Sequence, residues 1–110
     1  MNVRDKDYIF VRSNSVLTKI RLNDITYIHA LGDYVNIYMG EKYKHHTVHC
    51  TLKNMEEKLP ANKFFRIHRS YLVALDYIDT VEDNTAYVGK QYLPIAEQFK
   101  KELLKKLNMI

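Results

Sequence analysis

Residues 64–73 hold the densest group of side chains that could bind an anion. The donors are Arg66, His68, Arg69 and Ser70, and apolar residues on either side can anchor them in a core. An arginine guanidinium donates two parallel hydrogen bonds to a phosphate or a base edge, and serine and histidine add single directional bonds. The pattern therefore favours contact with a polyanion such as nucleic acid, although an edge strand with solvated polar side chains would show the same pattern.

The region around this segment is the most basic part of the chain. Residues 41–71 contain seven Lys or Arg against three Glu, and the whole chain has a net charge of +4. Four of the five histidines fall in the same region, where each can donate a hydrogen bond to an anion. We therefore expect the surface for an anionic partner to begin here.

The histidines also allow a metal site, with ligands from His45, His46, His49 and Cys50. On a strand, however, His45 and His49 would stand about 13 Å apart, whereas zinc holds its ligands at about 2 Å. The single cysteine excludes an internal disulfide and is expected to be a small buried residue in a reducing compartment. A metal-binding domain is a minor alternative, and we expect no metal and no cofactor.

A hydrolase built on Ser70 and His68 is a weaker alternative. Side chains two positions apart on a strand lie about 6.5 Å apart, and no carboxylate is obviously placed to orient the histidine. We therefore expect no catalytic residue and no small-molecule substrate.

The elements that must position these side chains are mostly short strands. Runs rich in Tyr, Ile, Val and Thr recur every eight to ten residues with turn residues between them, which is typical of an antiparallel β domain. One hairpin is expected around Asn14, and two central strands are expected to join at Gly32 and Asp33. The predicted strands are residues 8–12, 16–22, 25–31, 34–39, 43–48, 77–82, 86–88 and 92–95.

Two segments have helical periodicity instead. Leu52, Met55 and Leu59 follow Thr51, which can cap a helix, and Pro60 ends the segment. The closing helix follows residue 94 and turns four lysines to solvent, namely Lys100, Lys101, Lys105 and Lys106. A helix-turn-helix reader needs two adjacent helices, whereas roughly 40 residues separate these two. If the chain reads DNA, loops at the ends of strands must do so.

The composition is that of one soluble domain. The chain has 110 residues, of which 46% are hydrophobic and 27% charged, enough to bury a single core. No apolar run approaches the roughly 18 residues of a membrane span, and the first residues are polar. We therefore expect a cytoplasmic protein with no membrane partner.

Residues 64–73 resemble the central motif of the LytTR DNA-binding domain, the C-terminal output domain of bacterial response regulators. The family pattern is Phe, any residue, Arg, any residue, His, Arg or Asn, Ser and an apolar pair. Residues 24–35, D-I-T-Y-I-H-A-L-G-D-Y-V, are similar to the family signature I-x-Y-I-E-A-x-G-D-Y-V. Residues 51–60 resemble its short helix, and residues 93–95 its I-P-V. The resemblance covers nearly the whole chain in the right order.

The resemblance implies one LytTR-like domain over residues 1–110, with an elongated all-β antiparallel fold of about ten short strands and two small helices. In that family, loops enter two successive major grooves, and the segment between them crosses the minor groove. Carried over by position, the DNA-binding residues are Asp33, Tyr34, Arg66, His68, Arg69, Ser70, Glu97, Gln98 and Lys101. Family members often have Ser-Arg where Ala96 and Glu97 stand, and Glu97 could instead accept from a cytosine amino group or favour the helix start.

The resemblance also implies partners. They are double-stranded DNA bound sequence-specifically, a receiver domain upstream of these residues, a sensor histidine kinase, and a second copy that forms a dimer on repeated sites. A protein-interaction module without DNA binding is the alternative, and it would leave the basic motif unexplained.

Overall fold

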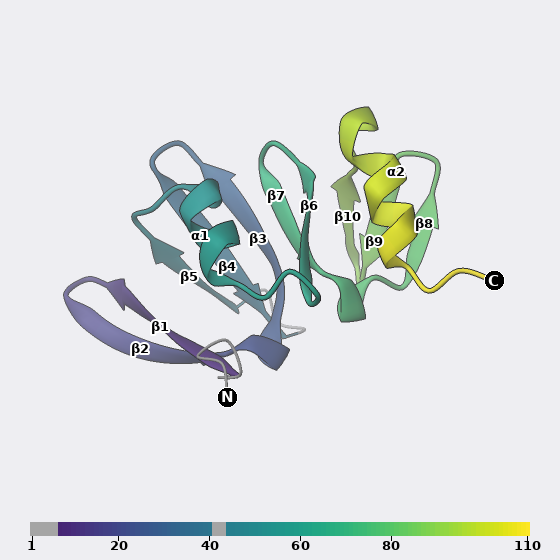
Figure 1. Cartoon of the computed structure of the whole chain (residues 1–110). Helices are drawn as coiled ribbons and strands as arrows, with labels where there is room; N and C mark the ends of the chain where they lie inside the picture. The colour runs from purple at the N-terminus through teal and green to yellow at the C-terminus, as the bar shows by residue number, and fades with distance from the viewer. Residues whose placement is uncertain (1–6, 41–43) are drawn as a thin grey trace.

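Ten strands and two short helices make up the part of the chain that the structure describes (Figure 1). The structure is a computed structural model and describes residues 7–40 and 44–110. The strands are β1 (Tyr8–Ser13), β2 (Val16–Arg21), β3 (Ile25–Leu31), β4 (Tyr34–Met39), β5 (Lys44–Val48), β6 (Phe64–His68), β7 (Tyr71–Ala74), β8 (Thr80–Glu82), β9 (Thr85–Val88) and β10 (Gln91–Pro94). The helices are α1 (Leu52–Lys58) and α2 (Glu97–Lys106), and 3₁₀ turns span Leu22–Asp24 and Leu75–Tyr77. The predicted mainly β class is confirmed.

The largest sheet has five antiparallel strands in the order β5-β4-β3-β7-β6. Side chains alternate between its faces, and Ile28, Ile37 and Leu72 are fully buried in one core cluster together with residues of α1. β3 lies at the centre of the sheet, which explains why its sequence is apolar on both faces. Tyr43, predicted as the first residue of β5, lies outside the described residues.

The predicted first hairpin is confirmed as a two-stranded sheet of β1 and β2. Asn14 and Ser15 both have positive φ, 52° and 67°, as a two-residue type I′ hairpin turn requires. The hairpin buries Val11 and Ile20 in the same core cluster as the large sheet. Ser13 Oγ donates to the carbonyl of Thr47 at 3.0 Å, which fastens the hairpin to β5.

The third sheet has the order β10-β9-β8 and carries α2 (Figure 1). Leu93 and Leu103 form a second core cluster with Ile67 and Val73 of the large sheet. Pro94 is tolerated at the end of β10 because this strand lies at a sheet edge. Within the described ranges, no helix is long and apolar enough to cross a bilayer.

The strand predicted over residues 77–82 is wrong in its first half. Leu75–Tyr77 is a 3₁₀ turn, in which the Ile78 amide donates to the Leu75 carbonyl at 3.2 Å. The chain turns here because it must leave the large sheet at β7 and enter the third sheet at β8. Tyr77 was predicted as the first residue of this strand. Its hydroxyl instead donates to the carbonyl of Asn23 at 2.5 Å.

Lys100 also differs from the sequence prediction, which turned it to solvent. Its ammonium donates to Asn84 Oδ1 at 3.1 Å, and the side chain is half-buried. The interaction ties α2 to the β8–β9 turn, so Lys100 holds the helix on its sheet.

Candidate nucleic-acid interface

Three connections meet at one edge of the molecule, along the top of Figure 1. β3 and β6 run in the same direction because both pair antiparallel with β7, so the β3–β4 and β6–β7 turns lie at the same edge. The start of α2 joins them, because the amide of Ala96 donates to the carbonyl of Ile67 at 2.8 Å. We call these three connections, residues 32–34, 69–70 and 97–101, the turn edge.

The β3–β4 connection presents Asp33 and Tyr34. Leu31 pairs with Tyr34 across a two-residue turn, and Gly32 has a φ of 60°, as expected at the first position of a type II′ turn. Asp33 is exposed, and Tyr34 keeps 49% of its surface exposed although its ring lies edge-on to His49 at 5.1 Å. Both side chains are therefore accessible on a rigid hairpin.

The β6–β7 connection presents Arg69 and Ser70. The Ser70 carbonyl accepts from the Ala30 amide at 2.9 Å, and the Ser70 amide donates to His68 Nδ1 at 3.1 Å. In the second bond the Nδ1 atom of His68 is the acceptor. Arg69 is exposed, and among the described residues its guanidinium has no partner. The turn thus offers a free arginine on a fixed backbone.

Arg66 occupies a different position, behind this turn. Its Nη2 donates to the Arg69 carbonyl at 2.6 Å, its Nε to the His68 carbonyl at 3.3 Å, and its Nη1 lies 3.4 Å from Glu56 Oε1 on α1. Only 25% of the side chain is exposed. The guanidinium is therefore committed to groups within the chain.

Aromatic rings support the turn from the opposite face of the sheet. His29 stacks on Tyr71 at 4.2 Å with an interplanar angle of 1°, and His68 meets Tyr71 edge-on at 5.7 Å. Burial lowers the pKa of His29, and the nearby His68 lowers it further. His29 was not among the predicted site residues, although the period-two alternation with Tyr27 places it on this face.

The start of α2 presents Glu97, Gln98 and Lys101, all exposed. Glu97 lies in the first turn of the helix, where a carboxylate is favoured by the helix dipole. Ala96 supplies no side-chain cap. The predicted contact residues therefore divide into two groups. Most lie on the turn edge, whereas Arg66 and His68 lie behind it.

Comparisons with known proteins identify the family to which this fold belongs. A family model described as the LytTr DNA-binding domain matches residues 15–108. The chain belongs to the LytTR family of DNA-binding domains. Its large-scale fold agrees with a solved structure, the LytTr DNA-binding domain of a putative methyl-accepting/DNA response regulator from Bacillus cereus. The TM-score is 0.77 at 17% identity, over 94% of this chain and 99% of that one.

Two curated relatives of this LytTR domain are both named Sensory transduction protein LytT. The Bacillus subtilis protein is 32% identical over 93 residues, which cover 78% of this chain and 37% of the relative. The Bacillus cereus protein is 30% identical over 97 residues, which cover 82% of this chain and 38% of the relative. The chain therefore spans less than two fifths of the length of these relatives.

Four exposed charges of the turn edge balance one another, and the remaining cation, Lys100, is bonded to Asn84. Asp33 and Glu97 offset Arg69 and Lys101, and all four are exposed. Lys63, from the basic region of the sequence, precedes β6 and lies at the opposite end of that strand from Arg69. The basic region thus does not form one continuous surface at this edge.

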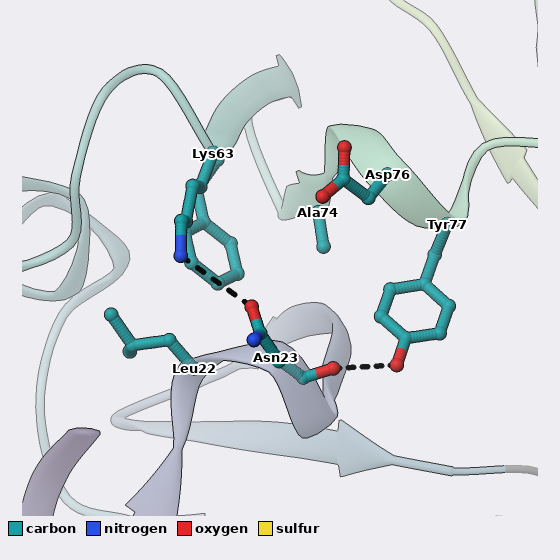
Figure 2. Close-up of a pocket in the computed structure, with 7 residues that line it drawn as sticks. Leu22, Asn23, Lys63, Ala74, Asp76 and Tyr77 are labelled. Atoms are coloured by element: carbon teal, nitrogen blue, oxygen red, sulfur yellow. Dashed lines mark hydrogen bonds between the residues drawn. The ribbon is translucent and has the colours of Figure 1, made fainter. Parts of the chain in front are cut away.

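A hollow of about 270 Å³ lies at the opposite edge of the LytTR domain, where β3 and β6 begin and β7 ends (Figure 2). Its lining residues are Leu22, Asn23, Lys63, Phe64, Ala74, Asp76 and Tyr77. Asn23 accepts from the Lys63 ammonium at 3.4 Å through its side chain and from the Tyr77 hydroxyl at 2.5 Å through its carbonyl. Asn23 thus links Lys63 and Tyr77 across the hollow, which joins the turn before β3 to the segments that flank β6 and β7.

The geometry bears on two alternative chemistries, a metal site and a hydrolase. Within residues 7–40 and 44–110, no group of three or more His, Cys, Asp or Glu side chains could hold a metal ion. His68 accepts from the backbone amide of Ser70 through Nδ1, so this nitrogen is not available to activate the Ser70 hydroxyl.

Proposed function

We propose that this LytTR domain binds double-stranded DNA sequence-specifically through the turn edge. The observation that carries the proposal is the convergence of three separate contact segments on that edge. Two backbone hydrogen bonds link the segments, one from Ala30 to Ser70 and one from Ala96 to Ile67. An edge built in this way holds its exposed side chains in fixed relative positions, as recognition of a base sequence requires.

The proposed geometry places the β3–β4 turn and the start of α2 in successive major grooves, with the β6–β7 turn over the minor groove between them. The longest dimension of the domain is 43 Å, and successive major grooves are about 34 Å apart. The domain as a whole is therefore longer than the spacing of two successive major grooves.

The exposed side chains suit direct contacts with bases. Carboxylates such as Asp33 and Glu97 can accept from cytosine N4, and an amide such as Gln98 can bind adenine. Arg69 suits a phosphate or the minor groove, where negative potential attracts arginine. Arg69 and Lys101 are the two exposed cations of this edge, whereas Lys100 is bonded to Asn84. The salt dependence should therefore correspond to about two phosphate contacts, a slope of roughly −2.

The wider role proposed for the chain is that of the output domain of a two-component transcription regulator. Its relatives are named sensory transduction proteins and are longer than this chain, which leaves room in them for a receiver domain. A sensor histidine kinase and a dimer on repeated sites complete this proposal. The proposal assigns no catalytic step to the domain.

The test is selection of duplexes from a random DNA pool, followed by titration of the enriched duplex against a scrambled duplex of equal composition. Specific binding should favour the enriched duplex by about 10³-fold or more. If no duplex is enriched, or if both duplexes bind equally, sequence-specific recognition is ruled out. Capture of a protein partner without any enriched duplex would favour the interaction-module alternative.

A further inference from the structure

Arg66 controls the two peptide planes that flank Arg69. The carbonyl of His68 belongs to the peptide before Arg69, and the carbonyl of Arg69 belongs to the peptide after it. Arg66 donates to both, through Nε at 3.3 Å and through Nη2 at 2.6 Å. Because these two planes set φ and ψ of Arg69, they also set the direction in which its side chain leaves the backbone.

Two other contacts hold the turn at Ser70. The Ser70 amide is held by His68 and the Ser70 carbonyl by the Ala30 amide. The Ser70 amide belongs to the same peptide as the Arg69 carbonyl, so its bond to His68 also orients the plane after Arg69. Neither contact involves the carbonyl of His68 or of Arg69. Among the described residues, Arg66 is thus the only side chain that hydrogen-bonds to both of these carbonyls.

The geometry of Arg66 depends on its planar fork of donors. A guanidinium can donate to two carbonyls at once in a fixed geometry, whereas a lysine ammonium is a point charge on a flexible stem. The third interaction, with Glu56 on α1, joins partly exposed groups at 3.4 Å and adds little by itself. The hydrogen bonds to the two carbonyls are therefore the main function of this side chain.

We propose that Arg66 is a positioning residue that makes no DNA contact and instead fixes the backbone from which Arg69 reaches the DNA. The inference rests on the proposed function and gives Arg66 a role different from the direct contact that its place in the motif implies. A turn that is already ordered loses less conformational entropy when DNA binds. Arg66 thereby raises affinity for the correct duplex without adding a phosphate contact.

The first experiment compares Arg66→Gln and Arg66→Lys with the wild type on the duplex enriched by the wild-type domain and on a scrambled duplex, at several salt concentrations. Arg12→Gln is the matched control, because it removes an exposed arginine from β1, away from the turn edge. Both Arg66 variants should bind the enriched duplex about tenfold more weakly, the usual effect of losing hydrogen bonds from a charged donor. The salt slope and the affinity for the scrambled duplex should not change.

A direct phosphate contact would give a different result. Arg66→Gln would then flatten the salt slope by about one unit and weaken both duplexes alike, and this outcome would overturn the proposal. Full rescue by Arg66→Lys would overturn it as well, because a point charge would then suffice.

The second experiment needs no DNA and so separates this inference from the proposed function. Backbone NMR should show faster amide exchange at Ser70 and altered amide shifts at Arg69 and Ser70 in both Arg66 variants, but not in Arg12→Gln. Unchanged amides in folded variants would overturn the positioning role. If the wild type binds no duplex while these amides do respond, the proposed function fails and Arg66 still holds the turn.

Discussion

The two arginines of the central motif have different surroundings although only two residues separate them. Arg66 is largely covered and donates to backbone carbonyls, whereas Arg69 is exposed at the tip of the turn. The sequence identified both as donors, because residue type and spacing are visible in it. It could not show which guanidinium is already bonded, since that depends on the turn and on the carbonyl directions it creates.

Arg69→Ala should weaken binding to the enriched duplex by about 1 to 3 kcal/mol and flatten the salt slope by about one unit. The reason is loss of a cation that has no partner within the described residues and stands on the turn edge. Folding should survive, because removal of an exposed side chain costs within about 0.5 kcal/mol. Titrations at several salt concentrations measure the effect, and circular dichroism checks the fold. A folded variant with unchanged affinity and slope would remove Arg69 from the interface.

His29 predicts a pH dependence of stability. Burial, and then His68, lower its pKa below the ordinary value of 6.5. Between these two pKa values the unfolded chain binds more protons than the folded chain, so stability falls as pH drops through 6.5 and levels off below the folded-state pKa. Melting temperatures measured from about pH 7.5 to about pH 5 should therefore fall less in His29→Gln than in the wild type.

The control for this prediction is His49→Gln, which changes an exposed histidine beyond the end of β5. Its pH profile should run parallel to that of the wild type. If the His29→Gln profile also runs parallel, His29 does not contribute to the pH dependence.

At the scale of elements, turn-forming residues predicted two hairpin turns that have positive φ. The β6–β7 turn has no residue of positive φ and was missed. Gly32 and Asn14 adopt positive φ and mark their hairpins in the sequence. The β6–β7 turn has Arg69 and Ser70 at its tip, and the register shifts between Arg66 and His68. That irregularity breaks the period-two alternation, and side-chain bonds rather than turn-forming residues fix the tip. The hairpin was therefore not predicted as two strands.

The N-cap of helix α1 was predicted from the sequence, and its contribution to stability can be measured. Thr51 Oγ1 accepts from the Asn54 amide at 3.0 Å, as predicted for the N-cap. Thr51→Ala should lower the free energy of unfolding by about 1 kcal/mol, because an amide at the helix start loses its acceptor. Thr51→Ser keeps the hydroxyl and should stay close to the wild type. Denaturant titration measures both, and an equal loss in the two variants would show that packing of the threonine methyl, not capping, is responsible.

At the scale of the whole molecule, one strand pairing assembles the site. β7 pairs with β3 although roughly forty residues separate them, and this pairing brings the β6–β7 turn beside the end of β3. Ile67 and Val73 then pack with Leu93 and Leu103, which fixes the third sheet and α2. Period-two alternation identifies strands but not their partners. The resemblance to the family, rather than the pattern itself, predicted which segments would act together.

The size of the domain leads to the last prediction, which concerns two copies on one duplex. A single module of this kind buries about 600 to 1,000 Å² on DNA, which limits its affinity. We expect the isolated domain to bind a duplex with two sites one or two helical turns apart, about 10.5 or 21 base pairs, more tightly per site than a one-site duplex.

At that spacing both copies lie on the same face of the DNA and can touch each other or share a deformation of the duplex. A spacing of about 16 base pairs places the copies on opposite faces and is the control, since it keeps both sites but prevents contact. The measurement is titration of the one-site and two-site duplexes at one fixed salt concentration. Equal affinity per site on all duplexes would mean that the domain carries no dimer contact of its own. Any dimer on repeated sites would then depend on contacts that these 110 residues do not make.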